Sequence, residues 1–213
     1  MAMKFAGGVI LGADSRTSSG TYVANRAADK ITQICDNVWM CRSGSAADTQ
    51  NVAQYVSRLA HEHAVSISSA AAGEDSGFTC DVKLVANLTK TIAYENKERL
   101  QAGMIIAGWD RKLGAQVYGI PLGGALMEAP FTVGGSGSAY IYGFCDNTFK
   151  EDMTREEAQN WVASAISLAI ARDASSGGVI RLVIIDAQGT ERKMLQPIEH
   201  TVCDDELPPI KRS

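Results

Sequence analysis

The sequence has 213 residues, 46% of them hydrophobic and 21% charged, and its formal net charge is −4 at pH 7. This length and hydrophobic content suffice for one sizeable domain with a buried core, and the acidic balance speaks against a nucleic-acid partner. No apolar run approaches the roughly 18 residues of a membrane-spanning helix, so no membrane partner is expected. The five cysteines are scattered without a CxxC pair, so we predict neither a zinc site nor a disulfide framework.

The first half of the chain is predicted to contain short strands followed by two helices. Apolar residues alternate or form short buried runs, which predicts strands, at residues 1–5, 9–14, 21–23, 31–34 and 37–42. Ser45 is positioned to cap the first helix, and residues 66–79, rich in Ser, Ala and Gly, are expected to form a surface loop. Asp81 is positioned to cap a second helix that runs to about Gln101.

The second half repeats this order and ends in a polar tail. Strands are predicted at residues 104–107, 115–120 and 126–133, helices at 139–149 and after Thr154, and a last hairpin at 179–185 and 193–196. Thr154 and Glu157 have the spacing of a capping box at the start of the second of these helices. Strands joined by hairpins form antiparallel sheets, and two helical layers outside two stacked sheets would bury every apolar face. We therefore predict one α+β domain spanning residues 1–213, a four-layer αββα sandwich, with a polar tail from about residue 200.

Chemically useful side chains recur where strands and helices end at turns rich in Gly and Ser. Asp14 follows a buried strand, and Lys30 precedes another, so the two can pair and shift each other's proton affinity. A purely structural salt bridge is an equally open interpretation of this pair. If the ends of the elements converge, the site also gains backbone N–H groups for an oxyanion, and it includes Arg42, Gly44, Ser136, Asp173 and Ser176.

Other candidate motifs do not hold up. His61 and His63 lie two residues apart on a predicted helix, so they point to different sides and make a poor metal site. Ser176 follows a helix and precedes a strand, which is the reverse of a nucleophile elbow. The sequence has only three histidines and no phosphate-binding loop with a trailing Gly-Lys-Ser/Thr. The residues alone therefore identify no nucleophile.

Nearly the whole chain closely resembles the proteasome beta-subunit family, and most of all its caspase-like catalytic beta-1 type of the 20S core. The resemblance is carried by the segments GGVILGADSRTSSGTYVANRAADKI, CRSGSAADTQ, MIIAGWD, GGSGSAYIYGF and RDASSGGVIRL. It implies an N-terminal nucleophile hydrolase of the αββα type, in which the hydroxyl of an N-terminal threonine attacks the peptide carbonyl. The α-amine of that threonine acts as the base, and no metal or organic cofactor is needed.

The resemblance also implies roles for individual residues. Lys30 would activate the threonine hydroxyl, Asp14 would orient Lys30, and the N–H of Gly44 would stabilise the oxyanion. The amine and a water molecule would be held by a set of polar side chains, namely Ser136, Asp173 and Ser176.

The substrate-binding residues implied by the resemblance surround a specificity pocket. Thr17 and Ser18 would lie on the strand that binds an extended substrate, and Arg42 would form the pocket base and favour acidic residues. Thr49 would be a polar wall of that pocket, and Ala28 stands where a hydroxyl residue is common. An ordinary surface arginine at the end of a strand is the alternative interpretation of Arg42.

The resemblance puts the catalytic threonine three residues before Met1, outside the sequence given. Either this sequence starts at an internal methionine or without its first residues, or the subunit is inactive and structural. The complete set of supporting residues favours the first explanation. The expected partners are other proteasome alpha and beta subunits in stacked heptameric rings and unfolded polypeptide substrates, in the cytoplasm and nucleus. A self-assembling bacterial-type peptidase of the same fold is a weaker alternative.

Overall fold

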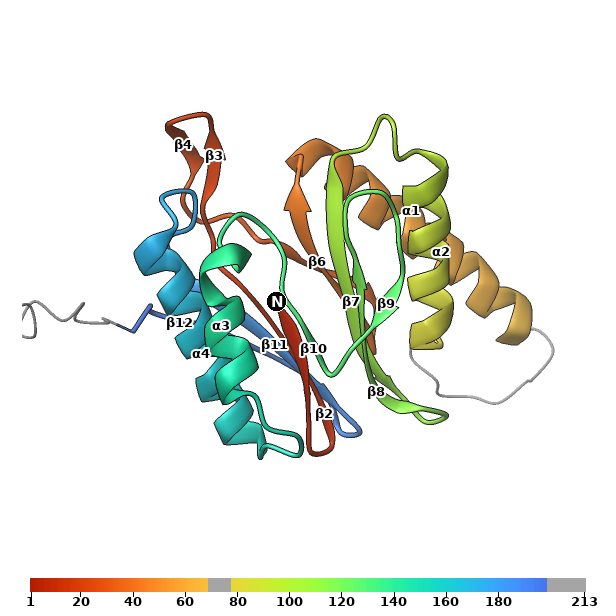
Figure 1. The fold of residues 1–213 in the computed structure, drawn as a ribbon. Coiled ribbons are helices and arrows are strands. Elements are labelled where there is room, and N and C mark those ends of the chain that lie inside the picture. The colour runs from red at the N-terminus through yellow and green to blue at the C-terminus, as the bar shows by residue number, and fades with distance from the viewer. Residues whose placement is uncertain (69–77, 199–213) are drawn as a thin grey trace, which may run out of the picture.

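The computed structural model describes residues 1–68 and 78–198 of the chain. Within these residues, two antiparallel five-stranded sheets stack face to face, and a pair of helices covers the outer face of each sheet (Figure 1). The predicted α+β sandwich with four αββα layers is therefore confirmed. In the described part of the chain, no helix has the length and apolar character needed to cross a membrane.

The first sheet has the strand order β10-β1-β2-β11-β12 and is covered by α3 and α4 (Figure 1). Its elements are β1 (Ala2–Phe5), β2 (Gly8–Ala13), β10 (Phe131–Thr132), α3 (Ser138–Thr148), α4 (Arg155–Arg172), β11 (Ile180–Asp186) and β12 (Gly189–Leu195). The predicted capping box is present, because Thr154 and Glu157 bond reciprocally at the start of α4. The predicted last hairpin is β11 and β12, paired from Ile180↔Leu195 to Asp186↔Gly189.

The second sheet has the order β5-β6-β7-β8-β9 and is covered by α1 and α2 (Figure 1). Its elements are β5 (Ile31–Cys35), β6 (Val38–Gly44), α1 (Ala46–Ser68), α2 (Val82–Glu95), β7 (Ala102–Asp110), β8 (Gly114–Ile120) and β9 (Met127–Glu128). A separate hairpin of β3 (Thr17–Ser19) and β4 (Tyr22–Asn25) projects beside the two sheets. As predicted, Ser45 caps α1 by accepting a hydrogen bond from the Asp48 N–H at 3.3 Å.

Three hydrophobic clusters hold the four layers together. Strand β2 contains three consecutive apolar residues, Val9, Ile10 and Leu11. Ile10 faces the α3–α4 layer, whereas Val9 and Leu11 face the other sheet. All three side chains are fully buried. A sheet that is covered on both faces needs apolar residues at consecutive positions, and this requirement explains the pattern.

Three predicted boundaries were wrong. Helix α1 continues to Ser68, into the predicted loop, and residues 69–77 of that loop lie outside the described part. Helix α2 ends at Glu95 instead of near Gln101, because Asn96 bonds back to the Ile92 carbonyl and the chain turns there. The predicted polar tail, from about residue 200, lies outside the described residues, which end at Ile198.

The third wrong boundary is the single strand predicted at residues 126–133. It is two short strands in different sheets, β9 paired with β8 and β10 paired with β1. The chain changes sheets at Pro130, which has no N–H to donate to a sheet ladder. Ala129 still donates to the Val117 carbonyl of one sheet, while the Pro130 carbonyl accepts from Lys4 of the other.

Asp110, at the end of β7, takes over the capping role predicted for Asp81. The side chain of Asp81 makes no capping hydrogen bond to α2. The Asp110 carboxylate is buried and accepts hydrogen bonds of 2.6–3.1 Å from the N–H groups of Val82, Lys112 and Leu113 and from Gln116 Nε2. Burial raises the pKa of Asp110, but these hydrogen bonds outweigh it, so the net pKa lies below the ordinary value.

Replacing Asp110 with alanine should therefore lower the free energy of unfolding by about 2–4 kcal/mol, because several buried donors lose their acceptor. The depressed pKa adds a pH dependence: the stabilisation is present above the pKa of the unfolded carboxyl and is lost as the pH falls through the folded pKa. Urea unfolding at several pH values would measure both effects. The exposed Asp81→Ala is the matched control at the same helix end, and an equal loss in both variants would contradict the assignment.

Candidate active site

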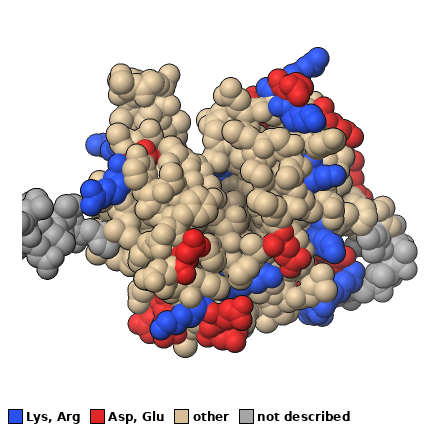
Figure 2. Space-filling view, viewed as in Figure 1, with Lys and Arg blue, Asp and Glu red and all other residues tan. Residues whose placement is uncertain are grey.

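A cleft of about 450 Å³ opens between the two sheets, and both sheets line it. Figure 2 shows the molecule hollowed between its two halves, beside the β3–β4 hairpin. All the predicted site residues except Asp173 line this cleft: Asp14, Thr17, Ser18, Ala28, Lys30, Arg42, Gly44, Thr49, Ser136 and Ser176. The ends of strands that are far apart in the sequence therefore converge in one cleft.

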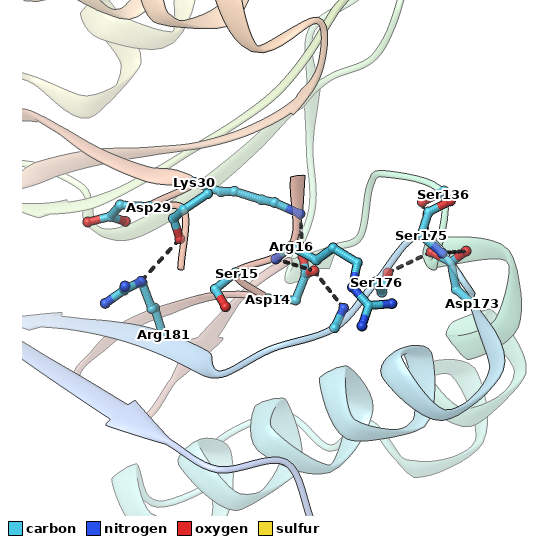
Figure 3. Close-up of polar contacts among 12 residues, drawn as sticks. Asp14, Ser15, Arg16, Asp29, Lys30, Ser136, Asp173, Ser175, Ser176 and Arg181 are labelled. Carbon is cyan, nitrogen blue, oxygen red and sulfur yellow. Dashed lines mark hydrogen bonds and ion pairs between the residues drawn. The ribbon is translucent and has the colours of Figure 1, made fainter. Parts of the chain in front are cut away.

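Asp14 and Lys30 form a close ion pair in the cleft. Lys30 Nζ lies 2.6 Å from Asp14 Oδ1, and the side chains are 26% and 13% exposed respectively. The other carboxylate oxygen of Asp14 accepts the backbone N–H groups of Arg16 at 3.1 Å and Gly177 at 3.0 Å (Figure 3). Asp14 is thus fixed by the backbone and holds Lys30 in place. An ammonium group has three N–H donors, so Lys30 can still donate to a group bound in the cleft.

Asp173, at the C-terminal end of α4, lies behind the cleft wall and organises two hydroxyl groups. Its Oδ2 accepts hydrogen bonds from Ser136 Oγ at 2.7 Å and Ser176 Oγ at 2.6 Å, and its Oδ1 accepts from the Ser175 N–H at 3.0 Å (Figure 3). Burial raises the pKa of Asp173, but these hydrogen bonds and the charge of Lys30 outweigh it and lower the net pKa. Because both hydroxyls donate to Asp173, their lone pairs remain free to accept from an amine or a water molecule.

Gly44 ends β6 in a backbone conformation that requires glycine. Its φ is +97°, and a Cβ atom there would lie 2.2 Å from the Gln101 carbonyl oxygen. The next residue, Ser45, caps α1 through the Asp48 N–H, so the positive end of the α1 dipole adjoins this part of the cleft. The backbone at Gly44 is therefore fixed beside a helix N-terminus, an arrangement that suits a developing negative charge.

Arg42 brings a second cation into the cleft. Its Nε donates to Thr32 Oγ1 at 2.8 Å, Nη1 donates to Thr49 Oγ1 at 3.4 Å, and Nη2 donates to the Asp29 carbonyl at 2.6 Å. Among the described residues, no carboxylate lies within ion-pair distance of Arg42, and Arg192 binds the nearby Asp29 carboxylate at 2.5 Å. Burial lowers the pKa of Arg42 more than the charge of the Asp29 carboxylate raises it, but a guanidinium stays charged in a protein. Its positive charge is therefore available to an anionic ligand.

The rim of the cleft is formed by the β3–β4 hairpin and the segment that follows it. Thr17 and Ser18 lie on β3, where the register of the hairpin shifts between them. Ala28 lies in the connecting segment, and Arg181 of β11 fixes this segment by donating to the carbonyls of Ala28 at 3.2 Å and Ala27 at 3.1 Å. No local sequence pattern indicates this role of Arg181, because its partners are far away in the chain.

Two further residues support the site but were not among the residues predicted from the sequence. Ser15 is fully buried, donates to the Arg26 carbonyl at 2.6 Å and accepts the Val179 N–H at 2.9 Å, so it ties three segments together. No sequence pattern identifies such long-range partners. Thr32, whose hydroxyl accepts a hydrogen bond from Arg42 Nε, was missed as well, because a side-chain hydrogen bond between neighbouring strands depends on how those strands are placed.

Comparisons with known proteins agree with this architecture. A family model described as proteasome subunit matches residues 1–185. Proteasome subunit beta type-6 of Arabidopsis thaliana is 51% identical over 209 residues, which cover 98% of this chain and 86% of that protein. Proteasome subunit beta type-1 of Saccharomyces cerevisiae is 46% identical over 200 residues, which cover 94% and 88%. Proteasome subunit beta type-9 of Salmo salar is 45% identical over 195 residues, which cover 92% and 85%. The chain therefore belongs to the proteasome subunit family, as a beta-type subunit of the 20S core particle.

Proposed function

We propose that this subunit is catalytic, occupies the beta-1 position, and is a threonine-type endopeptidase that cleaves unfolded polypeptides preferentially after acidic residues. The observation that carries the proposal is the convergence of two differently paired cations in one cleft. Lys30 is bound to Asp14, whereas Arg42 is held by neutral groups and keeps its charge available. A basic pocket next to a polar reaction centre fits an acidic side chain beside the bond to be cleaved.

The pairing of β1 and β2 supports a nucleophile upstream of Met1. Met1 and Gly12 exchange two backbone hydrogen bonds, each of 2.8 Å. Residues that precede Met1 and continue this antiparallel pairing would lie opposite Ala13 and then Asp14. The preceding segment would thus lead into the cleft, toward Lys30. We propose that the threonine nucleophile lies in this segment, three residues before Met1.

In the proposed mechanism the threonine hydroxyl transfers its proton to the threonine's own α-amine and attacks the peptide carbonyl. The unperturbed pKa of an α-amine is about 7.7–8.0, so it can act as a base near neutral pH. Lys30 stabilises the developing alkoxide, and the Gly44 N–H stabilises the oxyanion. Ser136 and Ser176 accept hydrogen bonds from the protonated amine, which then protonates the leaving amine. A water molecule finally hydrolyses the ester.

The proposed activity belongs to a subunit assembled in the 20S particle. We propose that the single domain of residues 1–213 packs with other alpha and beta subunits in stacked heptameric rings, in the cytoplasm and nucleus. The competing proposal is a non-catalytic structural beta subunit of the same particle. The Asp173 cluster favours catalysis, because a structural subunit has no need for two cleft-lining hydroxyls that keep lone pairs free to accept hydrogen bonds.

An irreversible electrophilic peptide with aspartate at P1 would test the proposal on the native particle. We expect one adduct on this subunit, mapped by mass spectrometry to a threonine upstream of Met1. A probe that differs only in carrying leucine at P1 should label this subunit at least about 10-fold more slowly, which is the scale of one charge-assisted contact. Labelling of other beta subunits without labelling of this one would support the structural alternative.

A further inference from the structure

Two cysteines on the far side of the second sheet lie together, away from the cleft. Cys35 ends β5, and Cys80 lies just before α2. Their segments are joined by backbone and side-chain bonds: the Asp36 N–H donates to the Phe78 carbonyl at 2.8 Å, and Asn37 bonds the Cys80 carbonyl at 2.8 Å and the Cys80 N–H at 2.9 Å. The two segments therefore hold the cysteines in fixed positions relative to each other.

The two thiols differ in exposure and in their surroundings. Cys35 is 1% exposed within the core under α1 and α2, whereas Cys80 is half-buried at the edge of that core. Cys80 Sγ donates a hydrogen bond to the Ala60 carbonyl at 3.8 Å. The neighbouring Cys80 side chain and burial raise the pKa of Cys35, whereas the neighbouring Cys35 side chain lowers the pKa of Cys80 against the opposing effects of burial, Asp81 and Asp36. Cys80 is thus the less buried thiol and the one whose pKa is lowered, and Cys35 is the buried thiol beside it.

We propose that Cys35 and Cys80 are a peroxide-oxidation site, in which Cys80 reacts first and Cys35 then closes a disulfide. The Cys80 thiolate attacks one oxygen of hydrogen peroxide, the O–O bond breaks, and hydroxide leaves and becomes water, giving a sulfenic acid. The Cys35 sulfur then attacks the Cys80 sulfur, the S–O bond breaks, and the departing hydroxide takes the Cys35 proton as a second water molecule. Two thiols are oxidised and one peroxide is reduced. The bond would tie the end of β5 to the start of α2.

This proposal is independent of the peptidase activity and can be tested on the native particle. Particles would be treated with increasing hydrogen peroxide, alkylated, and digested with trypsin without reduction. Cys35 and Cys80 fall in the tryptic peptides of residues 31–42 and 59–83. We expect these two peptides to appear joined, two hydrogens lighter than their sum, in an amount that rises with peroxide and disappears on reduction. Fragmentation must put the bond at Cys35 and not at Cys41, which shares its peptide.

Single substitutions then test the order of the two steps. In Cys35→Ser, Cys80 should accumulate as a sulfenic acid that dimedone traps, and in Cys80→Ser, Cys35 should stay reduced. Cys145→Ser is the matched control, because Cys145 is buried in the α3–α4 layer, and this substitution should leave the joined peptides unchanged. The proposal is overturned if wild-type Cys35 and Cys80 stay reduced at peroxide doses that oxidise exposed methionines. It also fails if Cys80 proceeds to sulfinic acid without forming the bond.

Discussion

Replacing Lys30 with alanine is expected to slow peptide hydrolysis by this subunit by about 10²–10³-fold, the usual effect of removing one group that stabilises a developing negative charge. Lys30 Nζ lies 2.6 Å from Asp14 Oδ1 in the cleft. Removing the lysine side chain leaves the Asp14 carboxylate without its positively charged partner. The alkoxide of the nucleophile would then form next to a negative charge. The measurement is hydrolysis of an acidic reporter by purified particles carrying the variant.

A matched control separates this effect from a general loss of a lysine. Lys4→Ala makes the same change on β1, where Lys4 pairs with Glu128 at 3.3 Å and does not line the cleft. This variant should hydrolyse the reporter at the wild-type rate. Particles with Lys30→Ala should still assemble, because the pair lies in the cleft between the sheets and not in the three hydrophobic clusters. Assembled Lys30→Ala particles with the wild-type rate would refute the proposed reaction centre.

Replacing Arg42 with methionine should change which peptide bonds are cleaved without stopping cleavage. Methionine has a similar length but no charge, so kcat/KM for an acidic P1 reporter should fall by about 10–100-fold, the scale of one hydrogen bond to a charged group. The kcat/KM for an apolar P1 reporter should rise, since the pocket base becomes apolar. The measurement compares two reporters that differ only at P1, with the same particles.

The control for this variant is Arg58→Met, which removes an exposed arginine of α1 that pairs with Glu62 at 3.7 Å and lies over the Tyr55 ring. Its P1 preference should equal that of the wild type. Thr32→Val removes the acceptor of Arg42 Nε and should weaken the acidic preference less than Arg42→Met does, mainly through KM. An Arg42→Met subunit that keeps its full preference for acidic reporters would mean that another group selects the substrate.

Much of the fold could be predicted because its signals are local. The alternation of β1 and the capping box of α4 depend on residues within one turn or one strand, and both predictions were confirmed. The errors arose where distant segments decide. Asp110 instead of Asp81 caps α2, because the β7–β8 hairpin folds against that helix end. Pro130 moves the chain from one sheet to the other, and the apolar pattern around it gave no sign of this change.

The site was predictable to a similar degree. The position of Asp14 and Lys30 at the ends of strands indicated that they could meet, and the structure brings them within 2.6 Å. Their catalytic roles rest on the resemblance and stay predictions. The anchoring of Arg42 by Thr32 and the Asp29 carbonyl could not be predicted, because side-chain hydrogen bonds depend on the exact placement of neighbouring strands.

The central claim is that a threonine upstream of Met1 provides the nucleophile, and the most direct test is the intact mass and N-terminal sequence of this subunit from its native particle. The proposed mechanism predicts a mature chain that begins with a free threonine three residues before Met1, so that its amine can enter the cleft lined by Lys30 and Ser136. A mature chain that begins at Met1 or Ala2 would have no such nucleophile. That result would contradict the peptidase proposal and leave a structural beta subunit.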